Sequence, residues 1–267
     1  MKDCVAVFTW KRDPLLYLCL EAIRREDQQI PVIVFSDRGY CSNELLMTKE
    51  KFGAKLVVHH HNGGYGNSDN VLSGMATCVN DPELEILHCI EDDVIIHQDW
   101  FAWARAILNS GKAHSGEPTF AVALGRLPGD PPSTWYESPC ISWNTSCLRQ
   151  ALAMVPKDYC GPTREDLQKA ADRAFPNSRY RYGSGEQDGL FLRIIEHFKW
   201  RTAFPDHAYA SHIGFYGYNQ PTGRQEPEGT FEQKVEFCRK LLYDKARRTE
   251  WFGQSITERE MKWLPCR

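Results

Sequence analysis

The sequence predicts an α/β fold in which helices cover both faces of a mostly parallel central sheet. Short apolar runs of strand length alternate with longer amphipathic segments over roughly the first hundred residues. Glycine, proline and small polar residues separate the two kinds of segment. Strand–helix repeats this short are typical of right-handed βαβ units, whose strands lie parallel in one sheet. The chain has 267 residues, which is enough for one large domain with a sizeable core or for two small domains.

Each predicted element rests on its own local pattern. Four apolar runs predict buried strands, at residues 4–8, 31–35, 54–58 and 86–90. Three helices are expected between them, beginning at residue 13 and covering residues 44–52 and 70–79. Thr230 and Gln233 form a capping box ahead of a last helix with an apolar stripe.

Composition and charge exclude several classes of protein. Hydrophobic residues make up 42%, charged residues 25% and aromatic residues 12%, as in ordinary globular proteins. The net charge of −3 gives no overall basic field for nucleic acid or an acidic membrane. No apolar stretch is long enough to span a bilayer and no signal peptide is recognisable, so a cytoplasmic location is expected. The ten cysteines include no C-x-x-C pair, and we expect mostly reduced, buried thiols.

Three consecutive carboxylates, Glu91, Asp92 and Asp93, follow the apolar run at residues 86–90. Ligands of open α/β sheets bind beyond the carboxyl ends of the strands, and Arg12 and Asp37 follow two other predicted strands. In an extended chain Glu91 and Asp93 would point to one side and Asp92 to the other. A solvated acidic turn is the alternative. The buried strand ahead of the triplet favours a site for Mg²⁺ or Mn²⁺.

Several familiar nucleotide and nucleophile motifs are absent. The loop at residues 9–14 has no glycine, and the chain contains neither a G-x-G-x-x-G loop nor a Walker A loop. No G-x-S-x-G nucleophile elbow occurs. His59, His60 and His61 are adjacent, and neighbours in a strand point apart, so we do not expect a metal site there. Nucleotide phosphates would therefore be held by a metal ion and side chains.

The acidic triplet and its surroundings resemble the GT-A glycosyltransferases, whose nucleotide-sugar site carries a DxD-type motif. The E-D-D form, followed by apolar residues and Asp99-Trp100-Phe101, is similar to the N-acetylglucosaminyltransferase family. The stretch VFTWKRDPLLYLCLEAI resembles its first strand and helix, and PVIVFSDRG resembles its second strand. The resemblance is clear over residues 4–108 and patchier up to about residue 215. It implies one GT-A (Rossmann-like) domain over residues 1–267. Its parts would be a nucleotide-sugar-binding half, an acceptor and catalytic half, and a C-terminal helix with a tail, at residues 1–110, 111–229 and 230–267.

The resemblance implies a role for each candidate residue of the first half. Asp93 would bind Mn²⁺ or Mg²⁺ on the diphosphate of a nucleotide sugar, and Asp92 would contact the ribose or the donor sugar. Asp37 would face the base, which is expected to be uracil, and Arg12 would lie near the nucleotide. Asn70 could contact the nucleotide as well, although a loop that caps a helix is the alternative reading of its surroundings.

The second half is expected to supply the acceptor site and the base. Trp143 and Asn144 could hold the donor sugar, and Trp143 could equally be a core aromatic. Asp188, with Glu186 in reserve, matches the family's general base at the start of a helix, where the helix dipole also favours an acid. His212 is the candidate late histidine ligand for the metal or the phosphates, ahead of His207 in the segment 204–223.

The expected function is that of a metal-dependent hexosyltransferase that moves a sugar from a UDP-sugar to an acceptor hydroxyl, with inversion. The acceptor would be a cytosolic glycan, a protein or a hydroxymethylated base in DNA, the last as in a viral-type enzyme, and no membrane partner is expected. Two other classes stay open. One is a nucleotidyltransferase, which also uses paired acids and a metal, and the other is an inactive module that binds sugar nucleotides.

Overall fold

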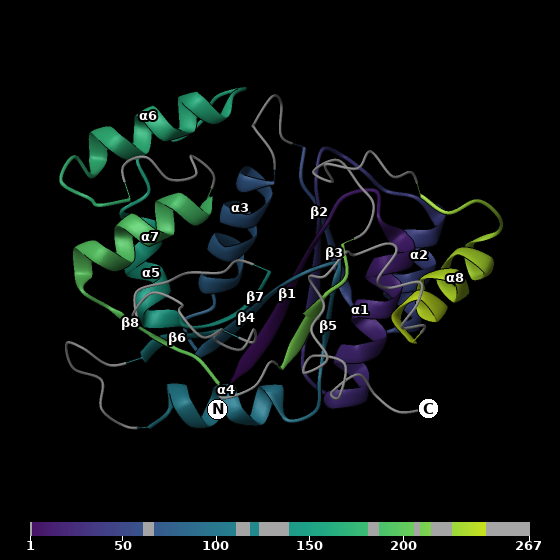
Figure 1. Ribbon diagram of the computed structural model, residues 1–267. Coiled ribbons are helices and arrows are strands. Elements are labelled where there is room, and N and C mark those ends of the chain that lie inside the picture. The colour runs from purple at the N-terminus through teal and green to yellow at the C-terminus, as the bar shows by residue number, and fades with distance from the viewer. Residues whose placement is uncertain are drawn as a thin grey trace.

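The computed structural model describes residues 2–60, 67–110, 118–122, 139–180, 187–205, 209–214 and 226–243, and it shows the expected α/β architecture (Figure 1). The strands of the central sheet are β1 (Asp3–Thr9), β2 (Val32–Ser36), β3 (Lys55–Val58), β4 (Ile86–Glu91), β6 (Pro118–Val122), β7 (Cys140–Asn144) and β8 (Arg201–Ala203). A small sheet pairs β5 (Val94–Ile96) with β9 (Ala210–His212). The helices are α1 (Asp13–Glu26), α2 (Asn43–Lys51), α3 (Ser68–Val79), α4 (Trp100–Leu108), α5 (Thr145–Ala153), α6 (Arg164–Ala174), α7 (Gln187–Phe198) and α8 (Phe231–Tyr243).

The central sheet has seven strands in the order β3-β2-β1-β4-β7-β6-β8. The pairs formed among β1, β2, β3 and β4 are all parallel, as is the pair of β6 with β8. Only β7 runs the other way among these strands, antiparallel to both β4 and β6. The predicted mostly parallel sheet is therefore confirmed.

Helices cover both faces of the sheet, and each face has its own hydrophobic core. Along β1, Val5 and Val7 belong to the core under α1, α4 and α8, whereas Ala6 and Phe8 belong to the core under α3, α5 and α7. This alternation is the two-residue period of a strand that is buried on both faces. Figure 1 shows α1 and α8 on one side of the strands and α3, α5 and α7 on the other.

The register of the strands decides which residues share an edge of the sheet. Phe8 of β1 pairs with Phe35 of β2 and with Glu91 of β4, so these three strands end together. The polar residues that follow them therefore lie along one carboxyl edge, as expected for a ligand site of an α/β sheet. In the reversed strand β7, Asn144 pairs with Ile86 at the opposite edge.

The structure also describes the start of α8, most of the cysteines and the apolar character of the helices. The backbone N–H of Thr230 donates to Gln233 Oε1 over 2.9 Å, which confirms the predicted cap of α8. The nine cysteines within the described ranges are free, and six of them are buried. In that same part of the chain, no helix combines the length and the apolar character needed to cross a bilayer. Glu186, His207 and the tail beyond residue 243 lie outside the described residues.

Candidate metal and nucleotide site

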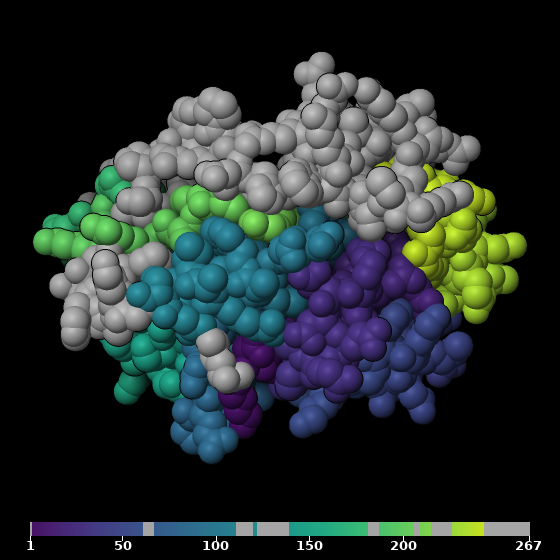
Figure 2. Space-filling model, turned by 90° about the horizontal axis from the view of Figure 1, so that it is seen from below, coloured from purple at the N-terminus to yellow at the C-terminus, as the bar shows by residue number. Residues whose placement is uncertain are grey.

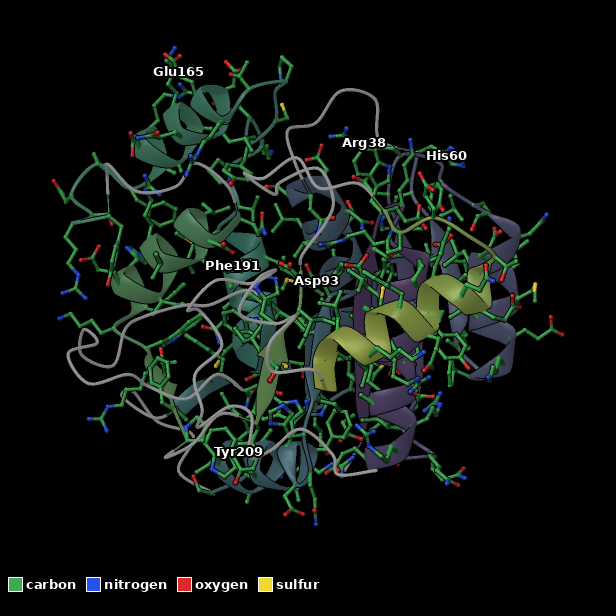
Figure 3. The ribbon with its side chains drawn as sticks, turned by 45° about the vertical axis from the view of Figure 1, so that its right-hand side comes forward. Arg38, His60, Asp93, Glu165, Phe191 and Tyr209 are labelled. Carbon is green, nitrogen blue, oxygen red and sulfur yellow. The ribbon has the colours of Figure 1, made fainter. Side chains whose placement is uncertain are left out.

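The acidic triplet closes β4 and forms the tight turn into β5. The backbone N–H of Asp92 donates to Phe8 O over 3.1 Å, so the turn remains attached to the end of β1. The carbonyl of Asp93 accepts from the N–H of Ile213 over 2.7 Å, which attaches the turn to the end of β9. Asp92 and Asp93 are buried, and Asp93 lies near the middle of the molecule (Figure 3).

Glu91, Asp93 and His212 form a compact cluster of metal-ligand groups. One ligand atom from each of them lies within 4.8 Å of the other two. The cluster depends on the small sheet, because the register of β5 and β9 pairs Val94 with His212 and so places His212 beside Asp93. His212 Nε2 lies 3.2 Å from Asp93 Oδ2. The structure thus brings the two predicted metal ligands together and adds Glu91.

Arg12 lies in the turn between β1 and α1 and forms ion pairs with two of the acids. Its Nη1 contacts Asp93 Oδ2, and its Nη2 contacts Asp92 Oδ1. The other oxygen of Asp92 accepts from the hydroxyl of Thr9 over 2.6 Å and from the N–H of Trp10 over 3.4 Å. Asp92 therefore holds the β1–α1 turn and orients Arg12, a positioning role that the sequence pattern did not suggest.

The buried charges perturb one another strongly. Burial raises the pKa of Glu91 to about 7, and the charge of Asp93 adds to the effect. Burial likewise raises the pKa of Asp92 to about 7, against the opposing charge of Arg12. Burial also acts to raise the pKa of Asp93, but the charges of Arg12 and His212 outweigh it and hold that pKa well below the usual range. The charge of Asp93 raises the pKa of His212 to about 9.

The residues present fit a divalent cation. Asp93 Oδ1 is buried and has no hydrogen-bond partner among the residues that the structure describes. Gly214 leaves open the space beside this carboxylate, because a Cβ there would collide with Asp93 Oδ2 and would lie 3.1 Å from His212 Nε2. Two carboxylates and an imidazole are an ordinary ligand set for a divalent metal ion. Asp93, His212 and Glu91 are therefore the residues that could hold it.

Asp37 follows β2 and lies at the same edge. Its N–H donates to Thr9 O over 3.1 Å, and its Oδ1 accepts from the N–H of Arg38 over 2.8 Å. Arg38 and Lys11 both have left-handed backbones, with φ of 53° and 57°. Their cationic groups lie 5.1 Å and 5.0 Å from the centre of the Trp10 ring. An aromatic ring flanked by cations thus lies at the end of β1, next to the predicted base-facing Asp37, and sequence reasoning passed over it.

Asn70 is buried in the first turn of α3, close to the ends of β2 and β3. Its Nδ2 donates to Phe35 O over 3.0 Å, and its Oδ1 lies 2.8 Å from His59 Nδ1. These bonds attach the start of α3 to the carboxyl edge of the sheet. A contact between Asn70 and a nucleotide stays a prediction.

Asp188 lies in the first turn of α7, whose start is bonded to the start of α3. The hydroxyl of Ser68 donates to Gln187 Oε1 over 2.7 Å, and the N–H of Gln187 lies 3.3 Å from Ser68 Oγ. The charge of Asp188 acts on Glu91, where it adds to the rise in pKa that burial causes. Asp188 therefore lies near enough to the cluster for its charge to act on Glu91.

The structure does not bring Trp143 and Asn144 to the acidic cluster. Trp143 is fully buried and packs against Phe120 and Phe191, with ring centres 4.8 Å and 5.4 Å away. Asn144 Oδ1 accepts from the N–H of Ser146 over 3.0 Å and so caps α5. The physical reason is the reversed direction of β7, which sends both residues toward the far edge of the sheet.

Comparisons with known proteins give likenesses of fold alone. No family model matches the sequence, and no curated protein matches it. The structure is similar to TarS 1-349 of S. aureus, with 16% identity and a TM-score of 0.49 over 79% of this chain and 60% of that one. It is similar to glucosyl-3-phosphoglycerate synthase of Mycobacterium tuberculosis, solved with Mn²⁺, UDP and glucosyl-3-phosphoglycerate (11% identity, TM-score 0.46, 94% of this chain and 80% of that one). It is also similar to a cytidylyltransferase of Leptospira borgpetersenii (11% identity, TM-score 0.49, 97% of this chain and 100% of that one). TM-scores and identities this low indicate a similar fold only, so the function has to be inferred from the residues of the site.

Proposed function

We propose that this chain is a metal-dependent glycosyltransferase of the GT-A type, which moves a sugar from a UDP-sugar to an acceptor hydroxyl with inversion. The observation that carries the proposal is the cluster of Asp93, His212 and Glu91 at the carboxyl edge of a parallel sheet, with Arg12 beside it. Open α/β sheets bind nucleotides at this edge. A buried acidic turn with an adjacent histidine is better explained by the binding of a metal ion and a diphosphate than by a purely structural role.

The proposed metal site would stabilise the departing UDP. A divalent ion held by Asp93, His212 and Glu91 would offset the charge that develops on the departing diphosphate. Carboxylates suit Mg²⁺ and Mn²⁺ alike, whereas an imidazole ligand favours a transition metal, so the set favours Mn²⁺. Arg12 adds a fixed positive charge at the same place, held in position by Asp92 and Asp93.

The nucleotide would lie over the ends of β1 and β2. The Trp10 ring offers a flat face for the base, and Asp37 can accept a hydrogen bond from the N–H of a uracil. Lys11 and Arg38 place two cations over that ring, and their charge would attract the phosphates of a nucleotide bound there. This arrangement would replace the glycine-rich phosphate loop that the chain lacks after β1.

Asp188 is the proposed general base. It would take the proton from the acceptor hydroxyl while the hydroxyl oxygen attacks the anomeric carbon. The bond between that carbon and the phosphate oxygen of UDP breaks as UDP leaves, and a single displacement of this kind inverts the configuration. In Asp188→Asn we expect the rate of sugar transfer to fall at least about 100-fold, with UDP binding unchanged. An unchanged rate would move the base to Glu186.

The reaction class is tested by measuring the release of UDP from several UDP-sugars with Mn²⁺. Each donor is offered with and without a glycan, a protein or DNA that carries hydroxymethylated bases. Transfer predicts UDP release that depends on one acceptor. Release of pyrophosphate from a nucleoside triphosphate would indicate a nucleotidyltransferase instead. UDP binding without turnover of any donor would indicate an inactive binding module.

Replacing Asp93 tests the acidic cluster itself. In Asp93→Asn we expect metal-dependent UDP release to fall at least about 100-fold, because a charge that acts directly at the reacting centre is lost. Asp99→Asn is the matched control, since Asp99 is an exposed acid six residues further along the chain. Circular dichroism checks that both variants fold. Full activity in Asp93→Asn would remove the cluster from the reaction.

A further inference from the structure

A cavity of about 360 Å³ lies between α1, α2 and α8, away from the acidic turn. Figure 2 shows α8 in yellow against α1 and α2 in purple and blue. Pockets that bind small molecules have volumes of roughly 300–1,000 Å³. None of the residues that line this cavity belongs to the candidate metal site.

Apolar side chains from three helices form much of the cavity wall. Tyr17 comes from α1, Met47 from α2, and Phe231 and Val235 from α8. The rings of Tyr17 and Phe231 meet edge to face with their centres 5.9 Å apart. Such a corner of two rings offers one face and one edge to a third, which suits a flat aromatic body.

Thr48 supplies an unsatisfied polar group to this wall. The residue is 1% exposed, and its hydroxyl oxygen has no hydrogen-bond partner in the described part of the chain. A buried hydroxyl without a partner is destabilising, and it is rare in folded proteins. A ligand atom in the cavity would satisfy it.

Lys51 lies three residues after Thr48 on α2, and its charge is not paired with a carboxylate within the described ranges. Its ammonium contacts the Tyr17 hydroxyl and lies 4.6 Å from the centre of the Tyr17 ring. The other cation in the wall, Arg239, is already paired with Glu21 and Glu236. Lys51 is therefore the cation in this wall that is available to an anion.

We propose that the cavity binds a small anionic molecule with an aromatic body, of the arylalkyl carboxylate class. Its ring would pack in the corner that Tyr17 and Phe231 form, and its carboxylate would accept from the Thr48 hydroxyl and the Lys51 ammonium. The exposed carboxylate of Glu232 lines the cavity from α8, so it would repel the anion and direct it toward α2. Nothing in this proposal depends on the reaction proposed above.

Three probes of one shape test the chemistry on the full chain. The probes are 3-phenylpropionate, its uncharged amide and the cation 2-phenylethylamine, and calorimetry or ligand-observed NMR reports the binding. We expect the carboxylate to bind with a Kd below about 1 mM, and the other two at least about fivefold more weakly. Equal binding of all three would overturn the proposal, and so would a carboxylate that does not bind at about 10 mM.

Two variants and a control test whether Thr48 and Lys51 bind the carboxylate of the probe. Thr48→Val and Lys51→Met should each weaken binding of 3-phenylpropionate by about 3- to 10-fold. Lys49→Met makes the same change on the same helix outside the cavity, and it should leave binding unchanged. Thr48→Val should also raise the Tm of the ligand-free protein, because it removes an unsatisfied hydroxyl. A higher Tm with unchanged binding would show only a packing defect and would overturn the proposal.

Discussion

Gly214 follows β9 and lies against the carboxylate of Asp93, where only a hydrogen atom fits. We predict that Gly214→Ala weakens Mn²⁺ binding at least about tenfold, because the new methyl group must displace Asp93 or His212 from the ligand set. Electron paramagnetic resonance of Mn²⁺ measures the affinity directly.

Gly53→Ala is the contrasting variant for this prediction. Gly53 has a φ of +60° at the end of α2, and an added Cβ there would meet nothing within 4 Å. This change should lower the free energy of unfolding by about 1 kcal/mol through backbone strain and should leave Mn²⁺ binding intact. If Gly214→Ala bound Mn²⁺ as tightly as Gly53→Ala does, the ligand set would have to lie elsewhere.

Single residues show where sequence reasoning about the site worked and where it did not. Asp93 and Arg12 could be located because each follows an apolar run that ends at the carboxyl edge. Gly214 and Trp10 could not be located in this way, since their positions near the site depend on the conformation of turns that join distant strands. The contact of Asp92 with a ribose or donor sugar stays a prediction, and its hydrogen bond with Thr9 arises only when β1 and β4 lie side by side.

At the scale of the elements, a buried polar chain joins β1, β4 and β7. His88 Nδ1 lies 2.6 Å from Ser142 Oγ on the facing strand, and His88 Nε2 lies 3.4 Å from Asp3 Oδ2. Asp3 also accepts from Arg105 Nε over 2.5 Å, and Arg105 reaches Asp27 over 2.9 Å. Burial lowers the pKa of His88, so the folded state keeps this ring neutral where the unfolded chain would protonate it.

This chain of bonds predicts a loss of stability in acid. As pH falls below the ordinary histidine pKa of 6.5, the unfolded state binds a proton that folded His88 does not, so the free energy of unfolding decreases. Burial acts to raise the pKa of Asp3, but its bonds with His88 and Arg105 lower that pKa to about 2. The stability that Asp3 contributes is therefore present above its ordinary pKa of 3.8 and is lost between 3.8 and about 2.

Urea unfolding at several pH values between 7 and 4 measures the effect. The slope due to His88 should reach at most about 1.4 kcal/mol per pH unit, and it should disappear in His88→Gln. His197→Gln, which replaces an exposed histidine of α7, should keep the slope of the parent protein. Equal slopes in the parent protein and His88→Gln would contradict the prediction.

Most elements of the first half were predictable because each carries a strong local period, and β1 to β4 are parallel as expected. The short strand β5 and the helix α4 were not predicted. The second half was harder for a physical reason. Strand β7 is buried like its neighbours. Burial accounts for its apolar residues, but it does not determine whether the strand runs parallel or antiparallel to its neighbours. Its antiparallel pairing with β4 places Asn144 at the far edge, which no local pattern around residues 140–144 reveals.

At the scale of the whole molecule, the candidate site joins parts of the chain that are far apart in sequence. Arg12 precedes α1, Asp93 follows β4, Asp188 begins α7 and His212 ends β9. Three carboxylates crowd together there beside Arg12 and His212, and burial raises the pKa of Glu91 and of Asp92 to about 7, so full ionisation of the ligand-free turn is disfavoured. A cation that bound there together with a diphosphate, as proposed above, would stabilise the packing of all these elements at once.

We therefore predict that Mn²⁺ and UDP together stabilise the fold more than the sum of their separate effects. A ligand at 100 times its Kd adds about 2.7 kcal/mol to the free energy of unfolding, which for a chain of this size raises the Tm by about 5–10 °C. Mn²⁺ alone or UDP alone should give a smaller rise, because each leaves one charge of the site unbalanced. Thermal unfolding of the parent protein and of Asp93→Asn measures the coupling, which should vanish in the variant. Additive shifts in the parent protein would mean that the metal and the nucleotide do not share this site.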